Sequence, residues 1–268
     1  MNLEKQSRVE KLHVVFIGAG NLATHLAQAL FNTGGCIIDQ VYSRTLEAAD
    51  SLATKIKAEA TTDINKIKLG ADLYIVALRD NALTDLIHQI MLNKPDSLVV
   101  HTSGSTSMSI FEGLGNRYGV LYPMQTFSKD KKVDFSNIHF FIEANNTADC
   151  KLLTSLVGNI SKNVHLADSM QRKKLHLAAV FVCNFTNHMY TLATDILEQY
   201  DLPFDAMLSL IDETTEKIHS VHPKAAQTGP AVREDTEVMN KHLAMLSHMP
   251  DVQEIYRKIS KSIIKYNN

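Results

Sequence analysis

The chain has 268 residues, 45% of them hydrophobic, and a formal net charge of −2. That length is sufficient for a larger domain and a smaller second one, and the balanced charge gives no electrostatic reason to expect nucleic acid or an anionic membrane as a partner. Three cysteines are an odd number without metal-ligand spacing, so we expect no metal and a reducing, cytoplasmic environment. We also expect no signal peptide and no membrane span, because the first apolar run is only one strand long.

The first 165 or so residues alternate strand and helix signals, which predicts an α/β fold with a doubly wound, mainly parallel Rossmann sheet. A helix is predicted between the first two strands, and another over residues 46–57, capped by Thr45. Asp80 or Asn81 is expected to cap a helix to about residue 92, and residues 148–160 form one more. The predicted strands span residues 12–17, 36–42, 72–78, 97–101, 119–122, 139–143 and, as a short edge strand, 163–166.

A glycine motif, Gly18-Ala19-Gly20-Asn21-Leu22-Ala23, lies between the first strand and the first helix. In that position G-x-G-x-x-A is typical of a dinucleotide-binding turn: the first glycine permits the tight turn and the second lets the backbone approach the pyrophosphate. The helix N-terminus offers free N–H groups to the phosphates. The alternative is a plain glycine turn. The predicted cofactor-binding residues of this motif are Gly18, Ala19, Gly20, Asn21 and Leu22.

The end of the second strand indicates which dinucleotide is bound. A site that prefers NAD usually has Asp or Glu here, but this strand ends in Ser43-Arg44-Thr45. A guanidinium between two hydroxyls suits the 2′-phosphate of NADP, because Arg donates two parallel charge-assisted hydrogen bonds. Alternatively, Arg44 is solvated and Thr45 merely caps a helix. Asp39 lies too early in the strand to bind the ribose. Ala77 and Leu78, after a later strand, complete the predicted cofactor site.

Beyond about residue 167 the pattern becomes helical, so we predict an NADP-binding domain over residues 1–166 and a helical substrate and dimerisation domain over residues 167–268. Residues 168–200 are expected to form one long helix. Its stretch 177–183 is apolar on every face, which is typical of a helix buried on all sides. A domain of that size hardly provides such burial alone. We therefore predict a homodimer formed mainly through this helix.

Polar segments follow three strands at the expected carboxyl edge of the sheet, where ligands of open α/β sheets bind. The 78–81 turn is predicted to pass near the nicotinamide ribose. The 101–105 segment supplies the imidazole of His101 and the hydroxyls of Ser103 and Ser105, which can orient a carbonyl or carboxylate; alternatively, the hydroxyls only cap a helix near Thr106. Gln125 follows a strand that Pro123 is expected to end, and is predicted to bind substrate.

Polar side chains also lie on one face of the long helix. At 100° per residue, His176, Val180, Asn184 and Asn187 fall within one arc. Buried amides and imidazoles need partners, so these side chains either form a network across a dimer interface or hold substrate. A Gly-Pro turn at residues 229–230 presents Arg233 to an anionic substrate group, unless Arg233 pairs with Asp235 or with a helix C-terminus.

Together these motifs resemble a family of small bacterial NADP-dependent oxidoreductases that join a Rossmann domain to a C-terminal domain of unknown function. The resemblance covers nearly the whole chain and implies an NADP(H)-binding dimer, but no substrate. It rests on residues 18–23, 101–104, 122–127, 176–184 and 228–230, together with Arg233, Asp235 and His242.

The chain is also similar to the 6-phosphogluconate dehydrogenase superfamily, which includes β-hydroxyacid dehydrogenases, pyrroline-5-carboxylate reductase and deazaflavin-dependent NADP reductases. The hydroxyacid dehydrogenases have a catalytic Lys four residues before an Asn that Asn184 matches, but Val180 stands at the Lys position. The His-Pro-Met of prephenate dehydrogenases reads Tyr122-Pro123-Met124 here. Both departures argue against those two reactions. Imine reduction needs less from the protein, because a protonated imine is already electrophilic.

We therefore expect an NADPH-dependent reductase of a small carbonyl or imine compound, in which the cofactor supplies the hydride. Ser103 and Asn184 would orient the substrate, and His101 or His176 would donate the proton, because imidazole titrates near neutral pH. Ser105, Gln125, Asn187 and Arg233 are the predicted substrate contacts. Two alternatives remain: an NADP(H)-binding sensor or scaffold without catalysis, which Val180 favours, and a reductase of a flavin-like carrier.

Overall fold

The computed structural model describes residues 11–94 and 96–267. Two compact units form, and the division falls between Cys183 and Asn184. The first unit contains the sheet and the start of the long helix, and the second is helical. The predicted class, a Rossmann sheet followed by helices, is confirmed. The division falls inside the long helix, whereas the sequence suggests a boundary at residue 166, where the last strand ends.

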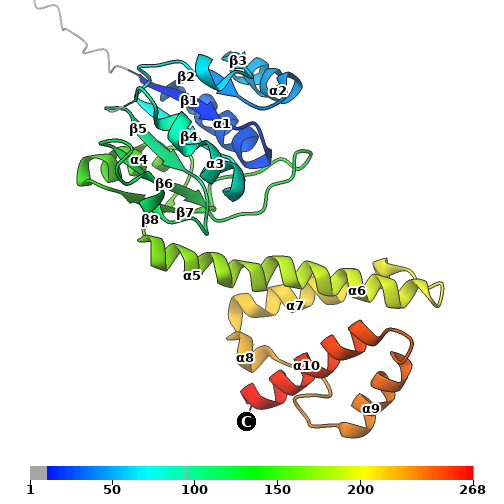
Figure 1. Ribbon diagram of the computed structural model, residues 1–268. Helices are drawn as coiled ribbons and strands as arrows, with labels where there is room; N and C mark the ends of the chain where they lie inside the picture. The colour runs from blue at the N-terminus through cyan, green and yellow to red at the C-terminus, as the bar shows by residue number, and fades with distance from the viewer. Residues whose placement is uncertain (1–10, 95, 268) are drawn as a thin grey trace, which may run out of the picture. The chain divides into compact units, whose positions relative to one another are not determined.

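The first unit contains one eight-stranded sheet of order β3-β2-β1-β4-β5-β6-β7-β8 (Figure 1). Neighbouring strands are parallel except β6 and β7, which are antiparallel. The carboxyl ends of β1, β4, β5 and β6 therefore meet at one edge, which is where ligands of such sheets bind. The strands are β1 (Leu12–Ile17), β2 (Cys36–Tyr42), β3 (Glu59–Thr61), β4 (Leu73–Val76), β5 (Leu98–His101), β6 (Tyr118–Pro123), β7 (His139–Ala144) and β8 (Asn163–Leu166).

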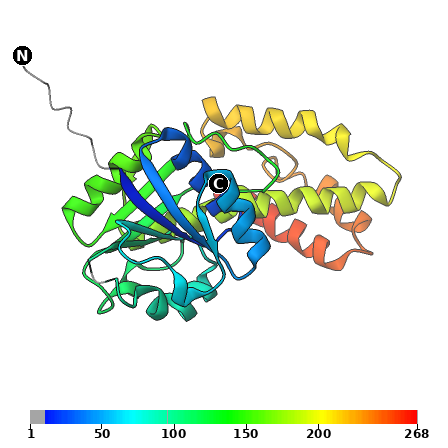
Figure 2. The same ribbon diagram turned by 90° about the horizontal axis from the view of Figure 1, so that it is seen from above.

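Helices cover both faces of the sheet (Figure 2). Successive strand residues point to opposite faces, so in β1 Phe16 joins a core with α1, α2 and α4, while Ile17 joins a second core with α3. Strands apolar on both faces are typical of a parallel sheet covered in this way. The covering helices are α1 (Asn21–Thr33), α2 (Leu46–Ile56), α3 (Asp80–Met91) and α4 (Thr147–Gly158), and short 3₁₀ turns are η1 (Ile64–Lys66) and η2 (Met108–Phe111).

The long helix predicted after the sheet is present, but it is not uniform. Asp168 and Gln171 form a capping box at its start, and helical residues run from α5 (Ser169–Ala179) through a π segment, η3 (Val180–Phe185), into α6 (Thr186–Glu198). A π turn contains more residues than an α turn because its hydrogen bonds span five residues. The assumption of 100° per residue, which placed His176, Asn184 and Asn187 in one arc, is therefore wrong beyond Val180.

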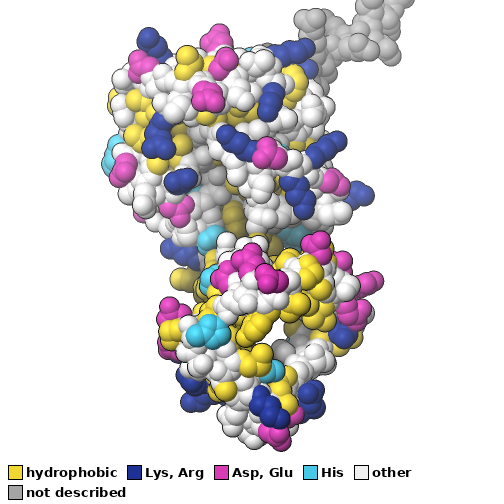
Figure 3. Space-filling model, turned by 90° about the vertical axis from the view of Figure 1, so that its right-hand side faces the viewer, with side chains coloured by type: hydrophobic (Ala, Val, Ile, Leu, Met, Phe, Trp, Pro, Cys, Tyr) yellow, Lys and Arg dark blue, Asp and Glu magenta, His cyan; other side chains and the backbone are white. Residues whose placement is uncertain are grey.

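The second unit continues with short helices whose apolar side chains are incompletely covered. The helices are η4 (Phe204–Met207), α7 (Leu208–Ser220), α8 (Pro223–Ala226), α9 (Thr236–Met245) and α10 (Pro250–Asn267). None of the residues within α6, α7, α9 or α10 is fully buried. Apolar side chains gather around hollows in the helical part of the chain (Figure 3). No helix among the described residues is both long and apolar enough to cross a bilayer.

The apolar stretch 177–183 is not buried by the chain itself. Leu177, Phe181 and Val182 are 60%, 61% and 75% exposed. Their burial in a dimer stays a prediction.

Candidate functional site

The glycine turn after β1 has the geometry of a phosphate-binding loop. Gly18 adopts φ +119°, and a Cβ added to it would lie 2.3 Å from the carbonyl oxygen of Ala77, so only glycine fits between β1 and β4. A Cβ on Gly20 would meet nothing within 4 Å, which leaves room in front of the α1 N-terminus. Gly20 is the N-cap and provides no side-chain cap, and the first turn contains no acidic residue. The turn therefore presents unneutralised N–H donors to an anion.

The residues after β2 suit a phosphate better than a ribose hydroxyl. Arg44 is exposed. Thr45 occupies the N-cap position of α2, but its hydroxyl makes no cap hydrogen bond. Thr45 thus lies at the predicted cap position without using its hydroxyl for the cap. Asp39 is engaged elsewhere, 3.0 Å from His13 Nδ1 and 3.3 Å from Lys68 Nζ.

The turn after β4 differs from the prediction at the start of α3. Arg79, not Asp80 or Asn81, is the N-cap residue, and its side chain makes no cap hydrogen bond. The Asp80 carboxylate instead accepts a hydrogen bond from the Ser105 hydroxyl. This bond ties the turn after β4 to the turn after β5, and it occupies a hydroxyl that the sequence assigns to substrate.

His101, at the end of β5, is completely buried. Its Nδ1 accepts from the Ser103 N–H at 3.1 Å and its ring stacks on Phe111, while its Nε2 has no partner of hydrogen-bonding geometry among the described residues. Burial, with the nearby Arg172 cation, lowers the pKa of His101 to about 3. The imidazole is therefore neutral at physiological pH and out of reach of a ligand. A buried, neutral His101 does not suit the predicted role of proton donor, and the role of His176 stays a prediction.

The hydroxyl of Ser103 is used within its own turn. Its Oγ accepts from the N–H groups of Ser105 at 3.2 Å and Thr106 at 3.0 Å, and donates to Thr106 Oγ1 at 3.0 Å. The predicted capping alternative is thus partly right, although no regular helix follows: the next turn, η2, is capped by Ser107.

Arg172 is a residue of this region whose role the sequence did not reveal. Arg172 begins a run of three cations, Arg172-Lys173-Lys174, in the first turns of α5, and its side chain is completely buried. The guanidinium donates to the Glu143 carboxylate at 2.5 Å, and to the carbonyl oxygens of Ser103 at 3.2 Å and Thr106 at 2.5 Å. It thus joins β7 and α5 to the 103–106 segment. Nothing in a run of three cations distinguishes the one that turns inward.

One helical turn beyond Arg172, His176 meets Tyr122 from the end of β6. The Tyr122 hydroxyl and His176 Nδ1 lie 3.2 Å apart, and the two rings pack edge to face with centroids 6.1 Å apart. Gly104 packs against both: a Cβ there would lie 2.7 Å from His176 Nδ1 and 2.8 Å from Tyr122 Cζ. Burial raises the pKa of the Tyr122 hydroxyl, so it stays protonated. The sequence offered Tyr122 only as a replacement for an imidazole of distant relatives.

The remaining predicted substrate residues are exposed and are not gathered by any hydrogen bond that the structure shows. Gln125 accepts from the neighbouring Thr126 N–H at 2.8 Å through its own Oε1. Asn184, Asn187 and Arg233 belong to the second unit. Asp235 accepts from Val238 N at 3.1 Å as the α9 cap, and no ion pair joins it to Arg233 within the described part of the chain.

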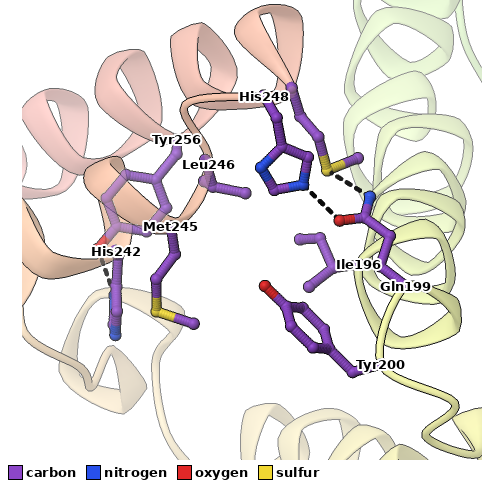
Figure 4. A pocket seen from close by; sticks show the side chains of 9 residues that line it. Ile196, Gln199, Tyr200, His242, Met245, Leu246, His248 and Tyr256 are labelled. Carbon is purple, nitrogen blue, oxygen red and sulfur yellow. Dashed lines mark hydrogen bonds between the residues drawn. The ribbon is translucent and has the colours of Figure 1, made fainter.

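The second unit contains a cavity of about 220 Å³ that none of the predicted site residues lines (Figure 4). Its wall is mostly apolar, with polar groups that pair with one another. Gln199 bonds to His248 and donates to the Met249 sulfur, and His242 Nδ1 lies 2.9 Å from the Tyr256 hydroxyl.

Comparison with known proteins agrees with this geometry. The family described as NADP oxidoreductase, coenzyme F420-dependent, matches residues 13–104, and a domain of unknown function, DUF2520, matches residues 138–263. No curated protein matches the chain. The crystal structure named "putative NADP oxidoreductase" from Bacteroides fragilis is 53% identical, with a TM-score of 0.90; the match covers 95% of this chain and 98% of that one.

More distant structures share the fold. An imine reductase from Myxococcus stipitatus in complex with NADP+ is 15% identical, with a TM-score of 0.67, over 94% of this chain and 92% of that one. A pyrroline-5-carboxylate reductase from Coxiella burnetii is 16% identical, with a TM-score of 0.57, over 96% of this chain and 98% of that one.

The fold and the glycine turn define a Rossmann-type oxidoreductase. More specifically, the chain belongs to the family of NADP oxidoreductases in which this domain is followed by DUF2520. The family and the enzyme class predicted from the sequence are thereby confirmed. The cofactor of the family is also the one predicted from Ser43-Arg44-Thr45.

Proposed function

We propose that this protein reduces a small carbonyl or imine compound with NADPH. The observation that supports a dinucleotide cofactor most directly is the glycine turn, where Gly18 fits only as glycine and the α1 N-terminus has no side-chain cap and no acidic residue in its first turn. Gly18 to Leu22 would bind the pyrophosphate, Ser43, Arg44 and Thr45 the 2′-phosphate, and Ala77 and Leu78 would lie near the nicotinamide ribose. Similarity to imine reductases and to pyrroline-5-carboxylate reductase supports the substrate class only at the level of fold.

When bound, the cofactor supplies a hydride, and the chain supplies position and a proton. His176 is the proton donor in this proposal, because it is half-buried and pairs with Tyr122, which lies at the carboxyl end of β6. Ser103, whose hydroxyl is used locally, contributes through the turn that it shapes. Asn184, Asn187, Ser105, Gln125 and Arg233 remain proposed substrate contacts.

The proposal includes a cytoplasmic homodimer with an N-terminal cofactor domain and a C-terminal substrate and dimerisation domain. The exposure of Phe181 and Val182 supports dimerisation, since a second copy would remove these apolar side chains from water. Three cysteines without a disulfide, Cys36, Cys150 and Cys183, fit a reducing compartment.

The experiment is to measure NADPH and NADH binding, and then to follow NADPH oxidation with cyclic imines, keto acids and flavins. We expect tight NADPH binding and turnover with an imine or carbonyl compound, and strongly reduced turnover in His176→Gln. Tight binding with no turnover on any compound, or turnover only with flavins, would contradict the proposed reaction.

A further inference from the structure

Two pairs in this protein join a histidine to a tyrosine by the same atoms. His176 Nδ1 lies 3.2 Å from the Tyr122 hydroxyl, and His242 Nδ1 lies 2.9 Å from the Tyr256 hydroxyl. Both pairs pack edge to face. Among the described residues, a glycine and a buried arginine contact the first pair and its turn: Gly104 packs on both rings, and Arg172 donates to the carbonyls of Ser103 and Thr106. The surroundings of the first pair therefore fix the position of the His176 imidazole, whereas the pair of His242 and Tyr256 is an ordinary side-chain contact.

The 103–106 segment fixes where the His176 ring can lie. Arg172 holds the carbonyls of Ser103 and Thr106 from one helical turn before His176. Gly104 then packs so closely on the imidazole and on the Tyr122 ring that even a methyl group would displace them. Since residues four apart lie on one face of a helix, Arg172 and His176 approach the same turn together.

The direction of the hydrogen bond follows from what Tyr122 can do. Its hydroxyl is protonated at neutral pH, and within the described chain His176 Nδ1 is its hydrogen-bond partner. A buried hydroxyl proton needs an acceptor. When the imidazole is neutral, Tyr122 therefore donates to Nδ1, and the imidazole proton is on Nε2.

We infer that Tyr122 is a positioning residue that occupies Nδ1 of His176 and leaves Nε2 as the nitrogen that exchanges a proton with the substrate. The inference rests on the proposed function for its catalytic part. A phenol suits this task in both protonation states of the imidazole, because its oxygen accepts from Nδ1–H of the imidazolium and its O–H donates to Nδ1 of the neutral ring.

The proton balance of the step is simple. As hydride adds to the substrate carbon, the imidazolium gives its Nε2 proton to the adjacent oxygen or nitrogen. The ring is left for a moment as the Nδ1–H tautomer, which is not its resting neutral form, and this proton faces the Tyr122 oxygen. Solvent then returns one proton to the ring. For an iminium substrate no proton is transferred in this step, and Nε2–H only orients the compound.

The test compares Tyr122→Phe with the matched control Tyr256→Phe, and one arm needs no substrate. Nitrogen-15 spectra of the histidine rings, recorded on full-length protein under conditions where His176 is neutral, report the tautomer of each imidazole. We expect His176 to be mainly the Nε2–H form in the unmodified protein and to become a mixture in Tyr122→Phe. Tyr256→Phe should leave the His176 signals unchanged, and His176→Gln assigns them.

The second arm measures turnover with the carbonyl substrate found in the screen. We expect Tyr122→Phe to lower kcat about tenfold, less than the roughly 10²–10⁴-fold of a whole acid–base contribution because His176 itself is retained, with an altered pH profile and unchanged NADPH affinity. Tyr256→Phe should keep normal turnover. An unchanged His176 tautomer and kcat in folded Tyr122→Phe would overturn the inference. If no substrate is ever found, the proposed function fails while the tautomer arm still decides the role of Tyr122.

Discussion

The sheet region, residues 11–166, and the helical region, residues 169–267, differ in how far their side chains are buried. In the sheet region every residue of β4 and β5 is buried, and isolated cations such as Arg117 find a carboxylate, here Asp149. In the helical region, apolar side chains such as Phe181 and Leu210 are each 61% exposed. Arg172 is the exception, because its backbone lies in α5 while its guanidinium binds Glu143 of the sheet strand β7. The contrast indicates that the first region is complete by itself and the second is not.

The largest expected effect comes from replacing Arg172. Arg172→Met takes the guanidinium from two carbonyls and from the partly buried Glu143, which keeps the Ser169 hydroxyl as a donor, so we expect a loss of about 3–5 kcal/mol in the free energy of unfolding. Urea unfolding measures it. Lys173→Met on the same helix, where the side chain is exposed, is the control and should change stability by less than about 0.5 kcal/mol. Equal effects of the two changes would refute the internal role of Arg172.

The next effect concerns the buried imidazole of the sheet region. The pKa of His101 is lowered to about 3 in the folded protein, so the unfolded chain binds the extra proton first. The stability that neutral His101 contributes is present above pH 6.5 and is lost as the pH falls toward 3. Between pH 7 and pH 4 this loss is about 3 kcal/mol, and His101→Gln should remove that part of the pH dependence. Parallel stability–pH curves for both proteins would contradict this.

The third effect concerns the cofactor rather than stability. Arg44→Ala should weaken NADPH binding by about 1.5–3 kcal/mol, or roughly tenfold to a hundredfold, because charge-assisted bonds to the 2′-phosphate are lost. NADH has no such phosphate, and its affinity should stay within about twofold. Calorimetric titration of both nucleotides checks the pair. Equal losses for NADPH and NADH would place Arg44 outside the 2′-phosphate site.

The smallest expected effect tests whether the helical region is completed by a second copy. Val182 is 75% exposed in the single chain, and Val182→Glu would place a charge in the proposed interface. We expect the dimer dissociation constant in sedimentation to rise at least about tenfold, or about 1.4 kcal/mol. Leu69→Glu, at a side chain that is 55% exposed in the sheet region, should leave it unchanged. A monomer in the unmodified protein would remove the explanation for the exposed stretch.

Local signals in the sequence predicted the sheet region well. Strands β1 and β2 have the predicted bounds, since a run of apolar residues bounded by turns is decided by nearest neighbours. The long helix was predicted as a whole, but not its π segment, because helix propensity does not indicate which residue is inserted. The helix spacing used for Asn184 and Asn187 failed for that reason.

The candidate site was predictable only where one local motif contains all of its chemistry. The glycines of residues 18–23 determine a phosphate-binding turn by themselves, because the needed backbone conformation and helix N-terminus follow from adjacent residues. Arg172 and Tyr122 depend on contacts with residues 69 and 54 positions away, Ser103 and His176, which no local pattern contains.

By itself the sequence determined the family, the Rossmann sheet and the class of cofactor, since each depends on short segments whose conformation is set locally. Tertiary structure decided the surroundings of the two candidate imidazoles. The sequence alone does not distinguish His101 from His176. In the structure His101 is completely buried and neutral, while His176 is half-buried and paired with the Tyr122 hydroxyl. The physical reason is that solvation and hydrogen-bond partners, which set the protonation of a side chain, come from segments distant in sequence.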